Sequence, residues 1–276
     1  MDATAARTAG EPGGADEAAR FARDGVVLLP GALDPGALAA AEAAWAWSLA
    51  NPGPLASRIA SEGSATFYQD LYNPRVLEGY EPMLRTSPLA ARIASIWGAP
   101  EVWFMYEQVF LKEGGEARRT PWHQDSSYLS VAGEHLAVAW ITFEALRAEQ
   151  SLEFVSGSHR GPLHDGSRFT LGDDTAPLWA DGSLPRLPDI EANRDAFDIV
   201  SFAVEPGDVV LFHPRTLHGG AATHGQQRRR TLTLRFLGAD ATYERRPGPA
   251  GPRPEGKPLV LEDGAPLRHP GFLKLA

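Results

Sequence analysis

Two histidines and one aspartate stand where they could bind a metal ion. His123 and Asp125 are two residues apart in the run PWHQD, and residues i and i+2 of a β-strand point to the same face of a sheet. His218 follows the apolar run Val209–Phe212 and precedes two glycines. Two imidazoles and one carboxylate on one face of an octahedron leave three positions open, as in non-haem iron(II) oxygenases. We therefore predict that His123, Asp125 and His218 are metal ligands and form the catalytic centre.

An arginine-rich run follows His218. In RRRTLTLRFL, strand alternation places Arg230, Leu232, Leu234 and Phe236 on one face and Arg229, Thr231, Thr233 and Arg235 on the other. We expect the first face to pack against helices and the second to line a cavity. Because a guanidinium matches a carboxylate, Arg229 is predicted to bind the distal carboxylate of 2-oxoglutarate, whose keto-acid end would chelate the iron. A solvated strand edge is the other interpretation of this run.

Composition limits the classes of function. The chain has 276 residues, no cysteine and a net charge of -9. The absence of cysteine excludes disulfides, cysteine-bound metals and thiol nucleophiles, and the acidic balance disfavours nucleic acid and anionic membranes as partners. Since neither a run of about 18 apolar residues nor a signal-peptide core is present, we expect a cytoplasmic protein with a small-molecule substrate. The oligomeric state stays open.

The elements that must position these residues change from helical to β along the chain. The patterns predict helices near 17–24, 34–49 and 87–97, a loop at 51–65, and strands at 25–30, 102–111, 136–143, 151–155, 199–204, 209–212 and 230–237. This order favours a mainly β core, a barrel or a sandwich, with flanking helices. We expect a disordered segment at 1–16, a single domain at 17–244, a functional loop or lid at 160–198, and a Pro/Gly-rich tail at 245–276.

The chain resembles the phytanoyl-CoA dioxygenase family. The matching residues are Phe21 with GVV at 25–27, WHQD at 122–125, LEFV at 152–155 with GSH at 157–159, PGD at 206–208, HG at 218–219, and Arg229, eleven residues after His218. The resemblance spans roughly 20–240. It implies a double-stranded β-helix, the jelly-roll or cupin-like barrel, with iron(II), 2-oxoglutarate and O2. It also suggests Gln108 and Trp140 as residues of the cosubstrate pocket.

These features favour a 2-oxoglutarate-dependent dioxygenase. It would hydroxylate an unactivated C–H bond of a free acid, an amino-acid derivative or a natural product, with release of succinate and CO2. Tyr106 and Tyr128 are candidates for the wall of the substrate pocket, although aromatic residues at strand spacing more often fill the core. Two alternatives remain: a cupin-like metalloenzyme that does not use 2-oxoglutarate, and a non-catalytic jelly roll that binds a ligand.

Overall fold

The computed structural model describes residues 14–59, 66–114, 119–220, 223 and 227–276. Its helices are α1 (Gly14–Asp24), α2 (Pro35–Ala50), α3 (Val76–Thr86) and α4 (Leu89–Trp97), with short 3-10 turns η1 (Asp125–Tyr128), η2 (Ala148–Gln150), η3 (Ser158–Arg160), η4 (Arg194–Ala196) and η5 (Pro254–Gly256). Asp34 caps the N-terminus of α2, because a side-chain oxygen of Asp34 accepts a 2.8 Å hydrogen bond from the backbone N–H of Ala37. None of the described helices combines the length and apolar character that a bilayer crossing requires.

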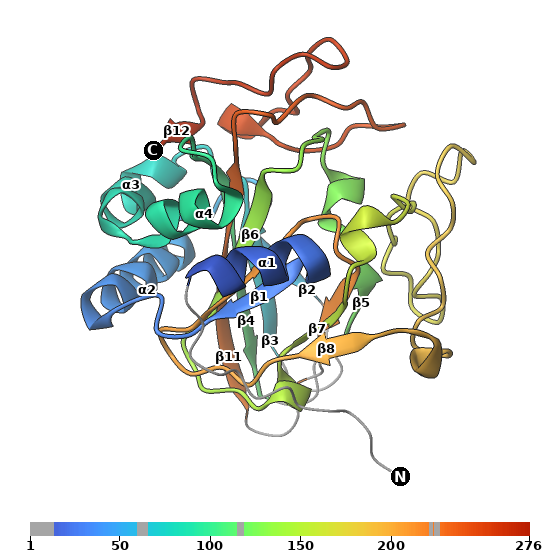
Figure 1. The fold of residues 1–276 in the computed structure, drawn as a ribbon, viewed down its shortest axis with the longest axis horizontal. Coiled ribbons are helices and arrows are strands. Elements are labelled where there is room, and N and C mark those ends of the chain that lie inside the picture. The colour runs from blue at the N-terminus through green and yellow to red at the C-terminus, as the bar shows by residue number, and fades with distance from the viewer. Residues whose placement is uncertain (1–13, 60–65, 115–118, 221–222, 224–226) are drawn as a thin grey trace.

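Two antiparallel sheets form the core of the fold (Figure 1). The larger sheet runs in the order β1 (Val26–Leu29), β9 (Val209–Phe212), β6 (Leu136–Thr142), β11 (Arg228–Leu237), β4 (Trp103–Glu113), β3 (Thr66–Leu71) and β2 (Ser57–Ile59), and β12 (Leu273–Lys274) also pairs with β4. The smaller sheet runs in the order β5 (Thr120–His123), β10 (His218–Gly220), β7 (Leu152–Val155) and β8 (Ile199–Ser201). Among the described strands no ladder joins the two sheets. They pack face to face, since Trp140 and Val210 of the larger sheet share a buried apolar cluster with Phe154 of the smaller one.

The two faces of the larger sheet have different neighbours. Leu232, Leu234 and Phe236 of β11 belong to the hydrophobic cluster that also contains residues of all four helices, and Figure 1 shows α2, α3 and α4 gathered on that side. Trp140 of β6 packs with Phe154 of the smaller sheet. Its Cα partner on β11 is Thr233, so the face of β11 that carries Thr233 is the inner one. The alternation predicted for β11 is therefore confirmed.

Arg230 is the exception on the outer face of β11. Its guanidinium forms ion pairs with Glu144 and with Glu42 of α2 and lies 5.7 Å from the ring centre of Trp45. The charge is thus neutralised at the edge of the helix layer, and its aliphatic stem covers apolar surface.

Several local predictions need correction. The expected loop at 51–65 contains the strand β2, and α3 and β3 were not predicted; α3 carries an internal proline, Pro82, which weakens any helical prediction from sequence. The segment expected to be disordered lies outside the described residues up to residue 13, but Gly14–Asp16 are helical. Asp16 and Glu17 stand in the first turn of α1, where acidic side chains are favoured by the helix dipole.

Two long segments lie outside the regular sheets. The polar stretch 160–198 carries only η4 beyond the end of η3 and forms the yellow loop beside the smaller sheet in Figure 1. The segment 245–276, predicted as a Pro/Gly-rich tail, contains η5 and β12 and packs on the body of the protein. Leu267 and Phe272 are buried in a cluster with Tyr243, because an apolar side chain gains free energy when it leaves water.

Candidate metal centre

The pairing of β5 with β10 brings the two histidines together. His218 and His123 are Cα partners in this antiparallel ladder, and their ring centres are 4.2 Å apart. Asp125 does not lie on the strand, as the two-residue spacing suggested; the strand ends at His123 and Asp125 begins the 3-10 turn η1. One potential ligand atom from each of the three buried residues lies within 4.8 Å of the others. The structure thus brings all three predicted ligands to one point.

Backbone carbonyl groups fix the orientation of both imidazoles. Nδ1 of His123 lies 2.8 Å from the carbonyl oxygen of Pro121, and Nδ1 of His218 lies 2.9 Å from that of Thr216. A neutral ring whose Nδ1–H donates to a carbonyl carries its lone pair on Nε2. Both Nε2 atoms face Asp125, with distances to its Oδ1 of 3.5 Å from His123 and 3.7 Å from His218. The free lone pairs therefore point where a cation would sit.

The electrostatic state of these residues suits metal binding. Burial, reinforced by the neighbouring His123, lowers the pKa of His218 to about 3, so its imidazole is neutral at physiological pH. Burial alone would raise the pKa of Asp125, but the guanidinium of Arg235 holds that pKa well below its usual range. The site therefore offers the carboxylate of Asp125 and the unprotonated imidazole nitrogen of His218. These are the ligand forms that a divalent transition metal requires.

Arg235 occupies the inner face of β11 beside this cluster. Its Nη2 and Nε donate to Oδ2 of Asp125 at 2.8 and 3.2 Å. The same Nη2 donates to Oε1 of Gln108 at 2.8 Å, and Nη1 lies 3.3 Å from Oγ1 of Thr233. The guanidinium carbon lies 4.6 Å from the ring centre of Tyr106. Gln108, predicted as a cosubstrate contact, is therefore engaged by Arg235.

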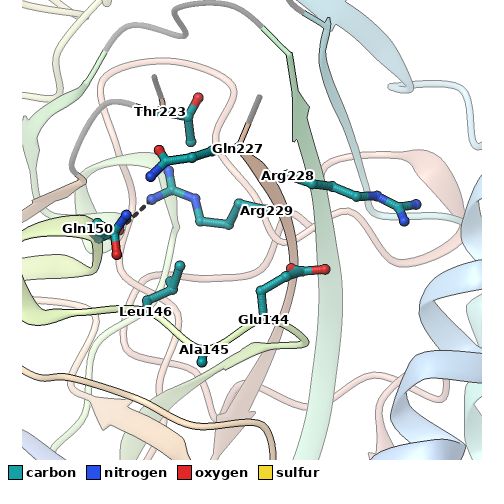
Figure 2. A pocket seen from close by; sticks show the side chains of 8 residues that line it. All are labelled: Glu144, Ala145, Leu146, Gln150, Thr223, Gln227, Arg228 and Arg229. Carbon is teal, nitrogen blue, oxygen red and sulfur yellow. Dashed lines mark hydrogen bonds between the residues drawn. The ribbon is translucent and has the colours of Figure 1, made fainter. Parts of the chain in front are cut away.

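Arg229 lies at the other end of the inner face of β11. It is buried, and its Nη1 donates to the carbonyl oxygen of Gln150 at 2.9 Å. Figure 2 shows its side chain directed into a pocket, whereas Arg228 points away from it. The pocket has a volume of about 100 Å3 and is lined by Glu144, Ala145, Leu146, Gln150, Thr223, Gln227, Arg228 and Arg229. The buried position of Arg229 disagrees with the alternative interpretation of a solvated strand edge.

Aromatic side chains surround the two histidines. Tyr128 of η1 and Phe169 of the 160–198 loop have parallel rings, with an interplanar angle of 12°. Both meet the ring of His123 edge-on, with centre-to-centre distances of 6.0 and 5.5 Å. Tyr106 is buried against Tyr72, with ring centres 4.0 Å apart. Tyr128 thus borders the ring of His123, while Tyr106 contacts Arg235, the partner of Asp125.

Comparison with known proteins connects this geometry to a family. The sequence model described as Phytanoyl-CoA dioxygenase (PhyH) matches residues 21–231, which include all three clustered ligands and Arg229. The chain belongs to the phytanoyl-CoA dioxygenase family. It is 27% identical over 190 residues to the human protein named phytanoyl-CoA dioxygenase, peroxisomal, a match that covers 66% of this chain and 52% of the human protein. The chain spans about half the length of the curated relatives it matches.

Several solved structures share the fold of this member of the phytanoyl-CoA dioxygenase family. The epimerase SnoN, in complex with Fe3+, alpha ketoglutarate and nogalamycin RO, superimposes with a TM-score of 0.71 at 23% identity, covering 95% of this chain and 98% of that one. The carbocyclase SnoK from nogalamycin biosynthesis gives a TM-score of 0.70 at 20% identity, covering 97% of this chain and 100% of that one. At this identity the likeness shows the fold alone, and it confirms the jelly-roll architecture.

Two residues of the site were not predicted from the sequence. The alternation of β11 placed Arg235 on the inner face, but nothing in the local pattern indicated that it would contact Asp125, 110 residues earlier. Phe169 lies in the loop expected to be a lid, and no motif marked it as a neighbour of His123. Trp140, predicted for the cosubstrate pocket, is buried on the inner face as the Cα partner of Thr233.

Proposed function

We propose that this protein is an iron(II)- and 2-oxoglutarate-dependent dioxygenase that oxidises a C–H bond of a small organic molecule. One observation carries the proposal. Three ligand atoms from His123, Asp125 and His218 lie within 4.8 Å of one another, and the Nδ1 atoms of both histidines are turned toward backbone carbonyl groups. Two nitrogens and a carboxylate are the donor set of non-haem iron(II) oxygenases and leave open positions for other ligands.

The residues present fit the metal and the cosubstrate. Iron(II) with 2-oxoglutarate and O2 supplies the oxidising power, and the cosubstrate leaves as succinate and CO2. His123, Asp125 and His218 would hold the metal. On the inner face of β11, Arg229 is suited to hold the distal carboxylate through a two-point contact. Lys112, its Cα partner on β4, is also buried and adds positive charge beside it.

The aromatic side chains around His123 shield the proposed metal centre from water. Tyr128 and Phe169 cover the ring of His123 with apolar surface, which excludes water from the centre and strengthens the electrostatic interactions within it. Phe169 belongs to the 160–198 loop and is 41% exposed, so it lies between the metal cluster and solvent. We propose that the substrate binds beside this aromatic pair, with the bond to be oxidised directed toward the open metal positions.

Family membership leaves the substrate class wide. The relatives carry names that refer to phytanoyl-CoA and, in a protein of Stutzerimonas stutzeri that is 27% identical over 121 residues, to hypophosphite. We propose a free acid, an amino-acid derivative or a natural product as the substrate, and hydroxylation as the outcome.

A screen for succinate tests the proposed function. The purified protein is incubated with iron(II), ascorbate, 2-oxoglutarate and candidate substrates, and substrate-dependent succinate is quantified. We expect succinate to accompany an oxidised product, and both to be lost in His218→Ala. If His218→Ala produced succinate and product at the wild-type rate, the metal centre would have been assigned to the wrong residues.

A further inference from the structure

The two oxygens of the Asp125 carboxylate face different partners. Oδ1 lies 3.5 and 3.7 Å from the Nε2 atoms of His123 and His218. Oδ2 accepts two hydrogen bonds from Arg235, at 2.8 and 3.2 Å. The oxygen on the imidazole side is thus the one that a metal would reach, while the other oxygen is turned away and held.

Arg235 is itself held at several points. It is 5% exposed, and its Nη2 also donates to Oε1 of Gln108, on the neighbouring strand β4. Its guanidinium lies over the ring of Tyr106, which in turn stacks on Tyr72. A guanidinium fixed by hydrogen bonds and ring stacking presents its donors in one orientation. The rigid partner of Asp125 is therefore Arg235, anchored in the larger sheet.

We infer that Arg235 is a positioning residue that keeps Asp125 a one-oxygen ligand. The inference rests on the proposed function and adds to it a reason why three metal positions stay open. If Oδ2 were released in this buried site, it would be an uncompensated carboxylate oxygen, which is costly. A bound metal could then satisfy it, and chelation through both oxygens would occupy a fourth position. Only two positions would remain for 2-oxoglutarate and O2, which need three.

The inference can be tested by counting water molecules on bound Mn(II), without cosubstrate or turnover. Water enriched in the magnetic isotope of oxygen broadens the electron paramagnetic resonance lines of Mn(II) according to the number of bound waters. Three single-atom protein ligands on an octahedral ion leave three positions for water. We expect three waters in the wild type and two in Arg235→Met, which removes the donors but keeps an unbranched side chain.

Arg230→Met is the matched control. Arg230 belongs to the same strand, but it lies on the outer face and pairs with Glu144 and Glu42, so this variant should keep three waters. Three waters in Arg235→Met would overturn the inference. Two waters in the wild type would overturn it as well, even if Arg235→Met did not fold. Failure of the wild type to bind Mn(II) would instead contradict the proposed metal centre itself.

Discussion

Arg229 and Lys112 are Cα partners across the β11–β4 ladder, and both side chains are buried. Burial lowers the pKa of Arg229 to about 10. Burial, together with the charge of Arg229, lowers the pKa of Lys112 to about 7. Two neighbouring cations in a region of low dielectric constant favour an anionic ligand. The proposed function places the distal carboxylate of 2-oxoglutarate beside them.

Replacing Arg229 should weaken cosubstrate binding. A hydrogen bond to a charged group contributes about 1.5–3 kcal/mol, so Arg229→Met is expected to raise the Kd of 2-oxoglutarate roughly 10- to 100-fold. Titration of the Mn(II)-loaded protein by calorimetry measures this change. Arg228→Met is the control, because Arg228 borders the same pocket but its side chain points away from it (Figure 2) and pairs with Glu113. An equal loss of affinity in both variants would contradict the role given to Arg229.

Lys112 should make cosubstrate binding depend on pH. Its pKa of about 7 means that the positive charge disappears as the pH rises through neutrality, and the attraction for a dianion falls with it. We expect the Kd of 2-oxoglutarate to rise between about pH 6 and 8 in the wild type and to change much less in Lys112→Met. Lys274→Met, at an exposed lysine paired with Glu101, should keep the wild-type profile. A profile in Lys112→Met as steep as that of the wild type would exclude Lys112 as its source.

Glu107 should make the folded protein less stable as the pH rises. A carboxylate whose pKa is lowered by folding has the opposite effect. It is 1% exposed, and burial raises its pKa to about 8. Its Oε1 accepts from the backbone N–H of Asn73, whereas Oε2 has no hydrogen-bond partner in the described part of the chain. Between the ordinary pKa of 4.5 and about 8, the folded state holds a proton that the unfolded state has lost. The raised pKa of Glu107 therefore contributes fully to the stability of the folded state below pH 4.5, and this contribution is lost as the pH rises toward 8.

Chemical denaturation at several pH values measures this effect. Each pKa unit corresponds to roughly 1.4 kcal/mol, so Glu107 should lower the free energy of unfolding by a few kcal/mol between about pH 5 and 8. Glu107→Gln should flatten that decline. Glu78→Gln, at an exposed position of α3, removes the same charge and should leave the decline in place. Parallel pH profiles for Glu107→Gln and the wild type would show that another group causes it.

Phe169 should limit the turnover of 2-oxoglutarate that is not coupled to oxidation of the substrate. Its ring covers the edge of His123 from the 160–198 loop, and its loss would admit water to the metal centre. Phe169→Ala is expected to raise succinate formation without substrate several-fold. Leu171→Ala is the control, because Leu171 lies in the same loop and is 84% exposed. If the two variants behaved alike, a general loosening of the loop would explain the result better than loss of the cover over His123.

The sequence predicted those features of the site that depend on local pattern. Alternation along β11 placed Arg229 on the inner face and Leu232 on the helix side, because the side-chain period of a strand is two whatever its partners. The predicted strands Val209–Phe212 and Leu136–Phe143 appear almost unchanged as β9 and β6, since continuous apolar runs of this length are typical of buried strands.

The contacts that local pattern cannot specify come from strand register and packing. The ladder that sets His218 opposite His123 joins residues 95 positions apart, and the contact between Arg235 and Asp125 depends on how β11 lies beside η1. The edge strand β2 is three residues long, too short for a periodic signal. The tail 245–276 packs through a few apolar residues such as Leu267 and Phe272, which stand among prolines and glycines and show no strand or helix period.

An anaerobic titration shows whether His123, Asp125 and His218 hold iron(II) with positions left open for the keto acid. Protein loaded with iron(II) is titrated with 2-oxoglutarate, without O2 or substrate, while the visible absorption is recorded. If His123, Asp125 and His218 hold iron(II) with open positions, the chelating keto acid should produce a weak charge-transfer band that saturates at one equivalent. The band should be absent in His218→Ala. Iron-loaded wild-type protein that gives no such band at saturating 2-oxoglutarate would contradict the account.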